Sequence, residues 1–269
     1  MDARKKAVIR ALWPALILGA SLAWTSAVRA RDASPGLVVL FTHDLHSNVL
    51  PRTVLGSDGA RSTAGGFARL ATLIRREHEA APGRTLVLDA GDYSMGTLFH
   101  TLYAEESFEL RLLGLMGYDA VAFGNHEFDF RLDGLSSSLA AAKAKGTRLP
   151  TVVASNIAVE GPGEVAEAGR AAFRDFPVRD YVVFERAGLK VGVFGIFGPN
   201  AADDSPFADP AVFLDPVEHA RRVVGLLRTR EKADLVVCLS HTGITTGRTR
   251  TWDILLAEEV PGIDVIVSG

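Results

Sequence analysis

Leu86-Val87-Leu88-Asp89-Ala90-Gly91-Asp92 is the stretch that decides the fold, because a short apolar run leads directly into a glycine and an acidic residue. A second such stretch is Ala120-Val121-Ala122-Phe123-Gly124-Asn125-His126-Glu127, in which an amide, an imidazole and a carboxylate follow the apolar run. Short apolar runs bounded by turn residues are typical of buried strands. In α/β sheets, ligand-binding groups gather beyond the carboxyl ends of such strands. The two stretches therefore predict an α/β protein with a polar site at one edge of its sheet.

Outward from these stretches, apolar runs alternate with segments of helical periodicity. Strands are predicted at residues 37–41, 85–88, 120–123, 151–154, 235–239 and 264–267. Helices are predicted at residues 67–79, 105–116, 132–145 and 216–230. This alternation indicates βαβ units and a layered α/β domain. Residues 181–184 and 190–197 predict a hairpin, so the sheets should be mixed, and residues 161–169 predict a loop.

The N-terminal segment has the parts of a secretory signal peptide, predicted at residues 1–30. Basic residues precede an apolar segment at 11–24, and the small residues of Val28-Arg29-Ala30 follow it. The apolar segment is shorter than the ~20 residues that span a bilayer, so we expect cleavage and no stable membrane insertion afterwards. An uncleaved membrane anchor is the alternative. The remainder, residues 31–269, is predicted to be one domain of a secreted or periplasmic protein.

Composition excludes some partners. The 269 residues are 48% hydrophobic, which is enough for a substantial core. The net charge is -3 with Lys and Arg scattered, so no basic stripe predicts a polymeric nucleic-acid partner.

The chain has a single cysteine, Cys238, which excludes an internal disulfide. Because Cys238 lies in an apolar run, we expect it to be a buried small hydrophobic side chain.

Polar residues after these runs are candidate metal ligands. Asp44 and His46 follow the first strand two residues apart, and on an extended segment both would face one cation. Taken alone, the pair is more typical of an ordinary hydrogen-bonded turn than of a metal site. Asp92 follows Gly91, and its two carboxylate oxygens can bridge two cations. His241 ends another apolar run, where a lone histidine is more often simply hydrogen-bonded. The joint pattern of all these clusters favours a metal site.

Further segments extend the pattern into a resemblance. They are Gly65-Gly66-Phe67-Ala68-Arg69-Leu70-Ala71-Thr72, Leu88-Asp89-Ala90-Gly91-Asp92, Gly117-Tyr118-Asp119-Ala120, Gly124-Asn125-His126-Glu127-Phe128-Asp129 and Ser155-Asn156-Ile157. In order and spacing the chain resembles the N-terminal calcineurin-like metallophosphoesterase domain of the 5'-nucleotidase and UDP-sugar hydrolase (2',3'-cyclic phosphodiesterase) family. The resemblance implies a four-layer α/β/β/α sandwich that lacks its last strands here.

The resemblance also implies ligand roles for individual residues. Asp44 and His46 would bind a first divalent metal, Asp92 would bridge to a second, and Asn125 and His241 would bind the second. In the family a Gly-His-x-His segment adds a histidine to each metal, and this chain stops at the corresponding glycine. We therefore expect a C-terminally incomplete domain, and a parent protein with a further C-terminal domain that supplies substrate specificity.

The chemistry expected of this site is phosphate-ester hydrolysis. Mixed Asp, Asn and His ligation suits Zn, Mn, Fe or Co. A pair of such cations neutralises phosphoryl oxygens and activates a hydroxide as the nucleophile. The resemblance leaves His126 free either to stabilise the transition state or to protonate the departing alkoxide, with Asp129 orienting the imidazole. The alternative for Asp129 is a helix-capping carboxylate. Glu127 is expected to hold either neighbouring loop amides or the residues that support the metal ligands, and no proton-transfer role is assigned to it.

The expected substrate is a nucleotide or another small phosphate ester, cleaved by a 5'-nucleotidase or cyclic-nucleotide phosphodiesterase type of reaction. Two alternatives remain open at this point. The first alternative is a related two-metal sulfur-oxidation hydrolase that acts on a thiosulfonate. The second is a non-catalytic secreted binding module or an inactive fragment. The donor residues at every strand end favour an active parent protein.

Overall fold

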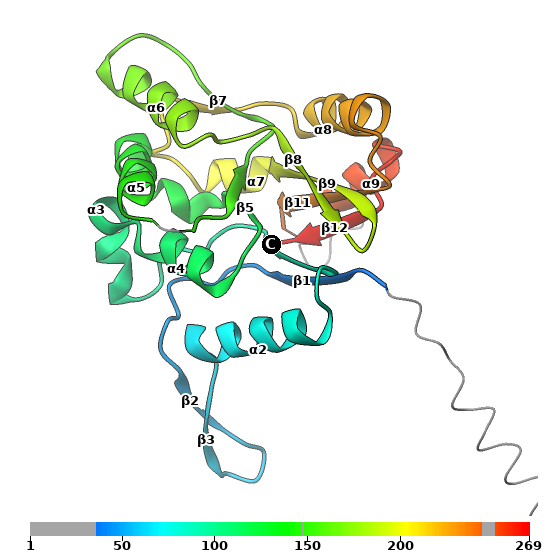
Figure 1. Cartoon of the computed structure of the whole chain (residues 1–269). Coiled ribbons are helices and arrows are strands. Elements are labelled where there is room, and N and C mark those ends of the chain that lie inside the picture. Colours follow the sequence, from blue (N-terminus) through cyan, green and yellow to red (C-terminus); the bar gives the residue numbers. More distant parts are fainter. Residues whose placement is uncertain (1–35, 147, 244–250) are drawn as a thin grey trace, which may run out of the picture. The chain divides into compact units, whose positions relative to one another are not determined.

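The computed structural model describes residues 36–146, 148–243 and 251–269, and Leu37–Gly269 forms one compact unit (Figure 1). The predicted signal peptide at residues 1–30 lies outside the described residues. Within the described part of the chain, every helix is too short or too polar to cross a membrane.

The first sheet is parallel and carries most of the predicted strands. Its strands are β1 (Val38–Thr42), β4 (Thr85–Asp89), β5 (Ala120–Ala122) and β6 (Thr151–Val153), in the order β1-β4-β5-β6. All three neighbouring pairs are parallel. The carboxyl ends of these strands therefore meet at one edge, as the sequence predicts.

The second sheet is mixed. Its strands are β8 (Tyr181–Arg186), β9 (Leu189–Phe197), β11 (Leu235–His241) and β12 (Val265–Ser268), in the order β12-β11-β9-β8. The pairs of β11 with β9 and β12 are parallel, whereas β8 and β9 are antiparallel. The predicted hairpin is confirmed, with Ala187 and Gly188 in left-handed conformations at its turn.

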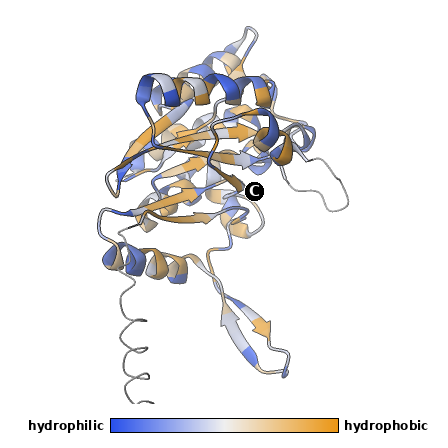
Figure 2. Ribbon diagram, turned by 90° about the vertical axis from the view of Figure 1, so that its right-hand side faces the viewer, coloured by the Kyte–Doolittle hydropathy of each residue, from blue (hydrophilic) through white to orange (hydrophobic). Residues whose placement is uncertain are grey.

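Alternating side chains along the strands produce four layers. Leu86 and Leu88 of β4 pack in one core with Val237 and Leu239 of β11, which places this core between the two sheets. Val87 of β4 joins a different core with the helices on the outer face of the first sheet. Apolar side chains on both faces of a strand are typical of a sheet that has other elements packed against each of its faces. Figure 2 shows these apolar strands stacked between helices that carry hydrophilic residues.

Helices cover both outer faces. Those contributing to the outer core of the first sheet are α2 (Phe67–Ala80), α4 (Phe108–Met116) and α5 (Arg131–Lys145). Those packed on the second sheet are α8 (Pro216–Leu226) and α9 (Trp252–Glu259). Cys238 is fully buried in the core beneath α8 and α9, which confirms its expected role as a small hydrophobic residue.

The remaining elements include one full helix, α6 (Glu164–Asp175), and several short elements. The short ones are the helices α3 (Tyr103–Glu106) and α7 (Pro199–Asp203), the 3-10 helices η1 (Leu98–Leu102) and η2 (Asn125–Phe128), the π-helical segment η3 (Leu227–Glu231), and the strands β2 (Arg52–Leu55), β3 (Arg61–Ala64), β7 (Ile157–Val159) and β10 (Ala211–Phe213). Antiparallel ladders join β2 to β3 and β7 to β10. The β2–β3 hairpin projects away from the sheets next to α2 (Figure 1).

Two predicted elements are wrong in detail. The predicted helix at 105–116 is interrupted at Ser107, which adopts φ 45 and separates α3 from α4. The buried hydroxyl of Ser138 donates to the Ser107 hydroxyl and helps to hold this break. The predicted loop at 161–169 contains the start of α6 instead. The helices α5 and α6 approach each other closely at Gly169. A Cβ added to Gly169 would lie 2.6 Å from the side chain of Leu132 in α5, so the close contact favours glycine at this position of α6.

The contact between the sheets gives a stability prediction at Gly195. An added Cβ would lie 2.2 Å from the carbonyl oxygen of Val153 in the facing sheet, so Gly195→Ala must push the sheets apart. We expect a loss of about 1–3 kcal/mol in the free energy of unfolding. Chemical denaturation followed by circular dichroism measures it.

Gly225 provides the matched control in an exposed turn of α8, where an added Cβ would meet no atom within 4 Å. Gly225→Ala should stabilise the protein by about 0.5–1 kcal/mol because alanine loses less conformational entropy in a helix. Equal effects of the two substitutions would contradict the close approach of the sheets.

Candidate metal centre

Asp44 and His46 lie in a turn after β1 and not on an extended segment. Both adopt left-handed backbone conformations, with φ 50 and φ 47, so the geometry predicted for the pair is wrong. The turn is held against the loop after β4, because the Asp44 and His46 amides donate to the Gly91 and Asp92 carbonyls at 3.0 Å. The two side chains nevertheless meet, with His46 Nε2 3.4 Å from Asp44 Oδ1.

Asp92 lies between two groups of candidate ligands. Its side chain is buried, and its Oδ2 is 3.3 Å from His241 Nε2 and 4.0 Å from His46 Nε2. Its other oxygen, Oδ1, accepts a hydrogen bond from the His126 amide at 2.9 Å. A carboxylate in this position can be shared by two cations.

Asn125 and His241 come together from different sheets. Asn125 begins η2 after β5, His241 ends β11, and Asn125 Oδ1 is 3.2 Å from His241 Nε2. The other ring nitrogen of His241, Nδ1, lies 2.9 Å from the carbonyl oxygen of Ala90. Because a carbonyl can only accept, this contact assigns the proton to Nδ1 and leaves the Nε2 lone pair facing Asp92 and Asn125 in the neutral imidazole.

The donor chemistry of these residues fits a pair of divalent cations. Within the described residues, two groups bring possible ligand atoms within 4.8 Å of one another: Asp44 with Asp92 and His241, and His46 with Asp92 and His126. Asp92 belongs to both groups. In the first group, Nε2 of His241 converges with the carboxylate oxygens of Asp44 and Asp92, and a cation bound there would replace the Nε2 proton. Metal-ligating histidines ordinarily donate their other N–H to a carbonyl, as His241 does to Ala90.

His126 and Asp129 form the predicted pair at the rim of this centre. His126 Nδ1 is 2.9 Å from Asp129 Oδ2, which leaves Nε2 directed elsewhere. The His126 ring meets the His46 ring edge to face, with the centroids 5.1 Å apart. His126 side-chain exposure is 23%, so a substrate has access to the imidazole. The geometry suits both a proton donor and a metal ligand.

Burial and neighbouring charges shift the pKa values of His241 and Asp92 at this centre. Burial lowers the pKa of His241, but the hydrogen bond and charge of Asp92, the Ala90 carbonyl and the charge of Glu127 outweigh burial and raise it to about 9. Burial opposes ionisation of Asp92, yet contacts with His241 and the His126 amide hold its pKa below the ordinary value. Asp92 is therefore an anion that strongly favours a neighbouring positive charge.

Glu127 is the anchor beneath the ligands. Its fully buried carboxylate accepts from the Asp92 amide at 3.0 Å and from the Gly124 amide at 2.6 Å on Oε2. Its Oε1 accepts from the Ser94 amide at 3.0 Å and from the Ser94 hydroxyl at 2.8 Å. Burial, followed by the charge of Asp92, raises the pKa of Glu127 to about 8 against these hydrogen bonds. The expected contacts with loop amides are thus present.

Sequence reasoning missed several supporting residues. Ser94 donates twice to Glu127, and buried Ser47, next to His46, donates to buried Glu109 at 2.6 Å. These partners lie far apart along the chain, so no local pattern could predict them. Glu127 alone had a local signal, because a glutamate three residues after the first residue of a turn commonly accepts from that residue's amide.

His43 also contacts the centre. The sequence predicts that it points away from the ligands as a surface or supporting histidine. It is exposed, and its Nδ1 lies 2.5 Å from Asp44 Oδ2. His43 therefore supports Asp44 from the solvent side.

Comparisons with known proteins agree with this geometry. Residues 37–269 match the calcineurin-like phosphoesterase family. The 5'-nucleotidase of Bos taurus is 31% identical over 239 residues, which is 87% of this chain and 37% of that protein. The crystal structure of a 5'-nucleotidase precursor from Thermus thermophilus superposes with a TM-score of 0.69 at 29% identity, covering 87% of this chain and 41% of that one.

A second solved structure shares only the fold. The sulfate thiohydrolase SoxB of Thermus thermophilus superposes with a TM-score of 0.66 at 21% identity, covering 87% of this chain and 48% of that one.

These matches establish that the chain belongs to the calcineurin-like phosphoesterase family. It spans two fifths or less of the length of most of the curated relatives that it matches, for example 37% of the Bos taurus protein and 16% of a Bacillus subtilis nucleotide phosphoesterase. The four-layer fold expected from the sequence resemblance is confirmed by the two packed sheets, their outer helices and these structural neighbours.

The Glu127 anchor yields a prediction. Glu127→Gln places an amide NH₂ where one carboxylate oxygen accepts, either against the Ser94 amide or against the Asp92 and Gly124 amides. We expect a loss of about 1–3 kcal/mol in the free energy of unfolding and a 10–100-fold weaker affinity for Mn²⁺ or Zn²⁺, as a rough range. Denaturation and calorimetric metal titration measure the two effects.

Glu164→Gln, at the exposed start of α6, is the matched control and should change neither quantity. Metal affinity that is equal in Glu127→Gln and Glu164→Gln would show that Glu127 does not position the ligands.

Proposed function

We propose that this chain is the metal-binding part of an exported hydrolase that cleaves nucleotide phosphate esters with two divalent cations, Zn, Mn, Fe or Co. The observation that carries the proposal is the position of Asp92, shared between one ligand group with Asp44 and His241 and another with His46 and His126. A carboxylate shared in this way is what a centre with two adjacent cations requires. Asn125 Oδ1 adds an oxygen beside His241.

Bound metals would supply charge neutralisation of the phosphoryl oxygens and activation of water. The protein's own residues orient the reaction around that centre. His126 is reachable from solvent, and Asp129 holds its Nδ1, so Nε2 is available to donate a proton to the departing alkoxide.

The substrate class is inferred from the relatives. Two of the relatives compared above are named 5'-nucleotidases, so a nucleotide monoester or cyclic nucleotide is the substrate that we propose. The SoxB likeness, at 21% identity, supports the fold alone and gives no reason to prefer a thiosulfonate. Export rests on the signal-peptide pattern at residues 1–30.

The proposal is tested by a substrate panel. The protein loaded with Mn²⁺ or Zn²⁺ is assayed with AMP, 2',3'-cyclic AMP and a thiosulfonate. We expect release of phosphate or opening of the cyclic ester, loss of activity with EDTA, and no thiosulfonate cleavage. Asp92→Asn should lose the activity, whereas Asp175→Asn, at the end of α6, should keep it. Metal binding without hydrolysis of any ester would favour a binding module.

A second test separates the two roles open to His126. His126→Ala should reduce kcat by roughly 10²–10⁴-fold while the bound metal, measured by elemental analysis, stays the same. His219→Ala in α8 is the control, since that side chain contacts the Asp215 carbonyl away from the centre. Parallel loss of metal and activity would make His126 a ligand of the group with His46 and Asp92.

A further inference from the structure

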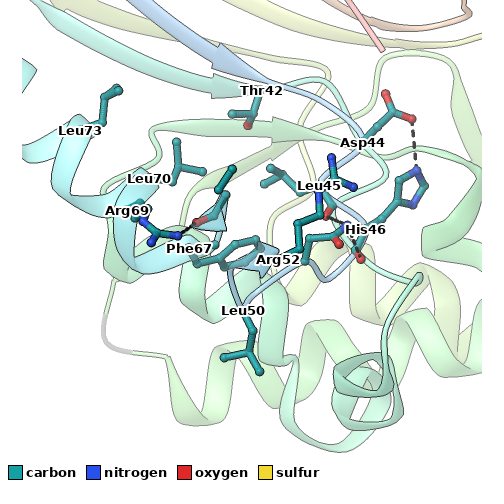
Figure 3. A pocket seen from close by; sticks show the side chains of 14 residues that line it. Thr42, Asp44, Leu45, His46, Leu50, Arg52, Phe67, Arg69, Leu70 and Leu73 are labelled. Atoms are coloured by element: carbon teal, nitrogen blue, oxygen red, sulfur yellow. Dashed lines mark hydrogen bonds and ion pairs between the residues drawn. The ribbon is translucent and has the colours of Figure 1, made fainter. Parts of the chain in front are cut away.

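A cavity of about 630 Å³ opens directly beside the candidate metal centre. Asp44 and His46 form part of its wall. The rest comes from the end of β1, the segment between β1 and β2, the base of the β2–β3 hairpin and the first turns of α2 with the glycines before it (Figure 3). Cavities of ~300–1,000 Å³ are the size that holds small ligands. A phosphate ester bound at the metals would therefore have room for its leaving group in this cavity.

Most of the lining is apolar. The side chains of Leu45, Leu50, Phe67, Leu70 and Leu73 contribute to it, and Leu50 and Leu73 are exposed. Such a surface can cover a ring or another carbon skeleton and exclude water from it. The apolar wall therefore favours a leaving group that presents an uncharged ring or carbon skeleton to it.

Two arginines also line this cavity, and their environments differ. Arg69 is engaged within the protein: its guanidinium donates to the Gly65 carbonyl at 3.0 Å and to the Thr63 hydroxyl at 2.6 Å. Through these bonds it ties β3 to the start of α2. The guanidinium of Arg52 has no hydrogen-bond or ion-pair partner among the residues that the structure describes. Arg52 is thus available to an anion in the cavity.

The wall that carries Arg52 is held in place. The Phe67 amide donates to the Val49 carbonyl at 2.9 Å, and Pro51 packs so closely on Gly66 that an added Cβ there would lie 2.8 Å from the Pro51 nitrogen. Arg52 follows immediately and pairs with Ala64 across the hairpin. The start of β2 therefore has a fixed position against α2.

The acidic group of the lining does not compete for Arg52. Asp44 Oδ2 is 2.5 Å from His43 Nδ1, and its Oδ1 is 3.4 Å from His46 Nε2. Both carboxylate oxygens already face imidazole nitrogens. The cavity consequently offers two positive charges that have no acidic partner among the described residues, and of these only the guanidinium of Arg52 also has no hydrogen-bond partner there.

We propose that this cavity is a leaving-group subsite and that Arg52 binds a second negatively charged group on the substrate. The inference rests on the proposed function and narrows it to phosphate esters whose leaving group joins an apolar body to an anionic group. Arg52 contributes a charge-assisted hydrogen bond to that group. It acts on substrate selection and not on the chemistry of the phosphoryl group.

The test compares phenyl phosphate with 4-carboxyphenyl phosphate, which differ by one negative charge on the leaving group. The measured quantity is the ratio of kcat/KM for the charged ester to that for the neutral ester. Arg52→Gln should lower this ratio by about threefold to tenfold, Arg52→Lys should restore part of it, and 0.5 M NaCl should reduce the difference between wild type and Arg52→Gln.

Arg61→Gln is the matched control, because Arg61 is an exposed arginine of the same hairpin that does not line the cavity. It should leave the ratio at its wild-type value. A ratio that is the same in Arg52→Gln and in wild type, or that falls equally in Arg61→Gln, would overturn the subsite.

A binding measurement separates failure of the subsite from failure of the proposed function. If the wild type hydrolyses neither ester, the affinities of both are measured by ligand-observed NMR in the presence of Zn²⁺. A preference for 4-carboxyphenyl phosphate that disappears in Arg52→Gln supports the subsite although the hydrolase proposal fails. Equal affinities of the wild type for the two esters overturn it.

Discussion

The hydrogen bonds accepted by the buried carboxylate of Glu127 hold the centre together. They join the loop after β4, through Asp92 and Ser94, to the loop after β5, through Gly124. The loop after β4 in turn accepts from the amides of the turn after β1. Three neighbouring strands of a parallel sheet thereby deliver their loops to one point, and a single carboxylate fixes the spacing between two of them. The ligand geometry follows from that spacing.

The second sheet completes the centre from the opposite side. His241, at the end of β11, reaches Asp92 and the Ala90 carbonyl only because the sheets pack closely at the carboxyl ends of their strands. The absence of a side chain at Gly195 permits part of this approach, since Val153 of the facing sheet occupies the space. The apolar core between the sheets and the polar centre at their edge therefore depend on the same packing distance. A change in one displaces the other.

The sequence predicted those features that depend on neighbouring residues. The strands that lead to Asp92 and Asn125 are short apolar runs with turn residues after them, so their positions and the convergence of their loops could be inferred. Features that depend on distant contacts could not. Nothing local indicates that Ser107 breaks a helix, since its hydroxyl meets Ser138 in another helix. The left-handed turn at His46 was missed for the same reason, because the loop after β4 holds it there.

Charge burial links the stability of this fold to cation binding. Burial raises the pKa of Asp89 to about 7 despite hydrogen bonds from the Thr42 hydroxyl and the Gly91 amide, and it raises the pKa of Glu127 to about 8. A raised pKa means that ionising the carboxyl costs more free energy in the folded protein than in the unfolded chain. Glu127 accepts a hydrogen bond from the amide of Asp92, which is a third buried acid. Cations bound at the centre would lower that cost through their charge, and a ligand that binds only the folded state stabilises it. Selection for metal binding and selection for a stable fold therefore act on the same carboxylates.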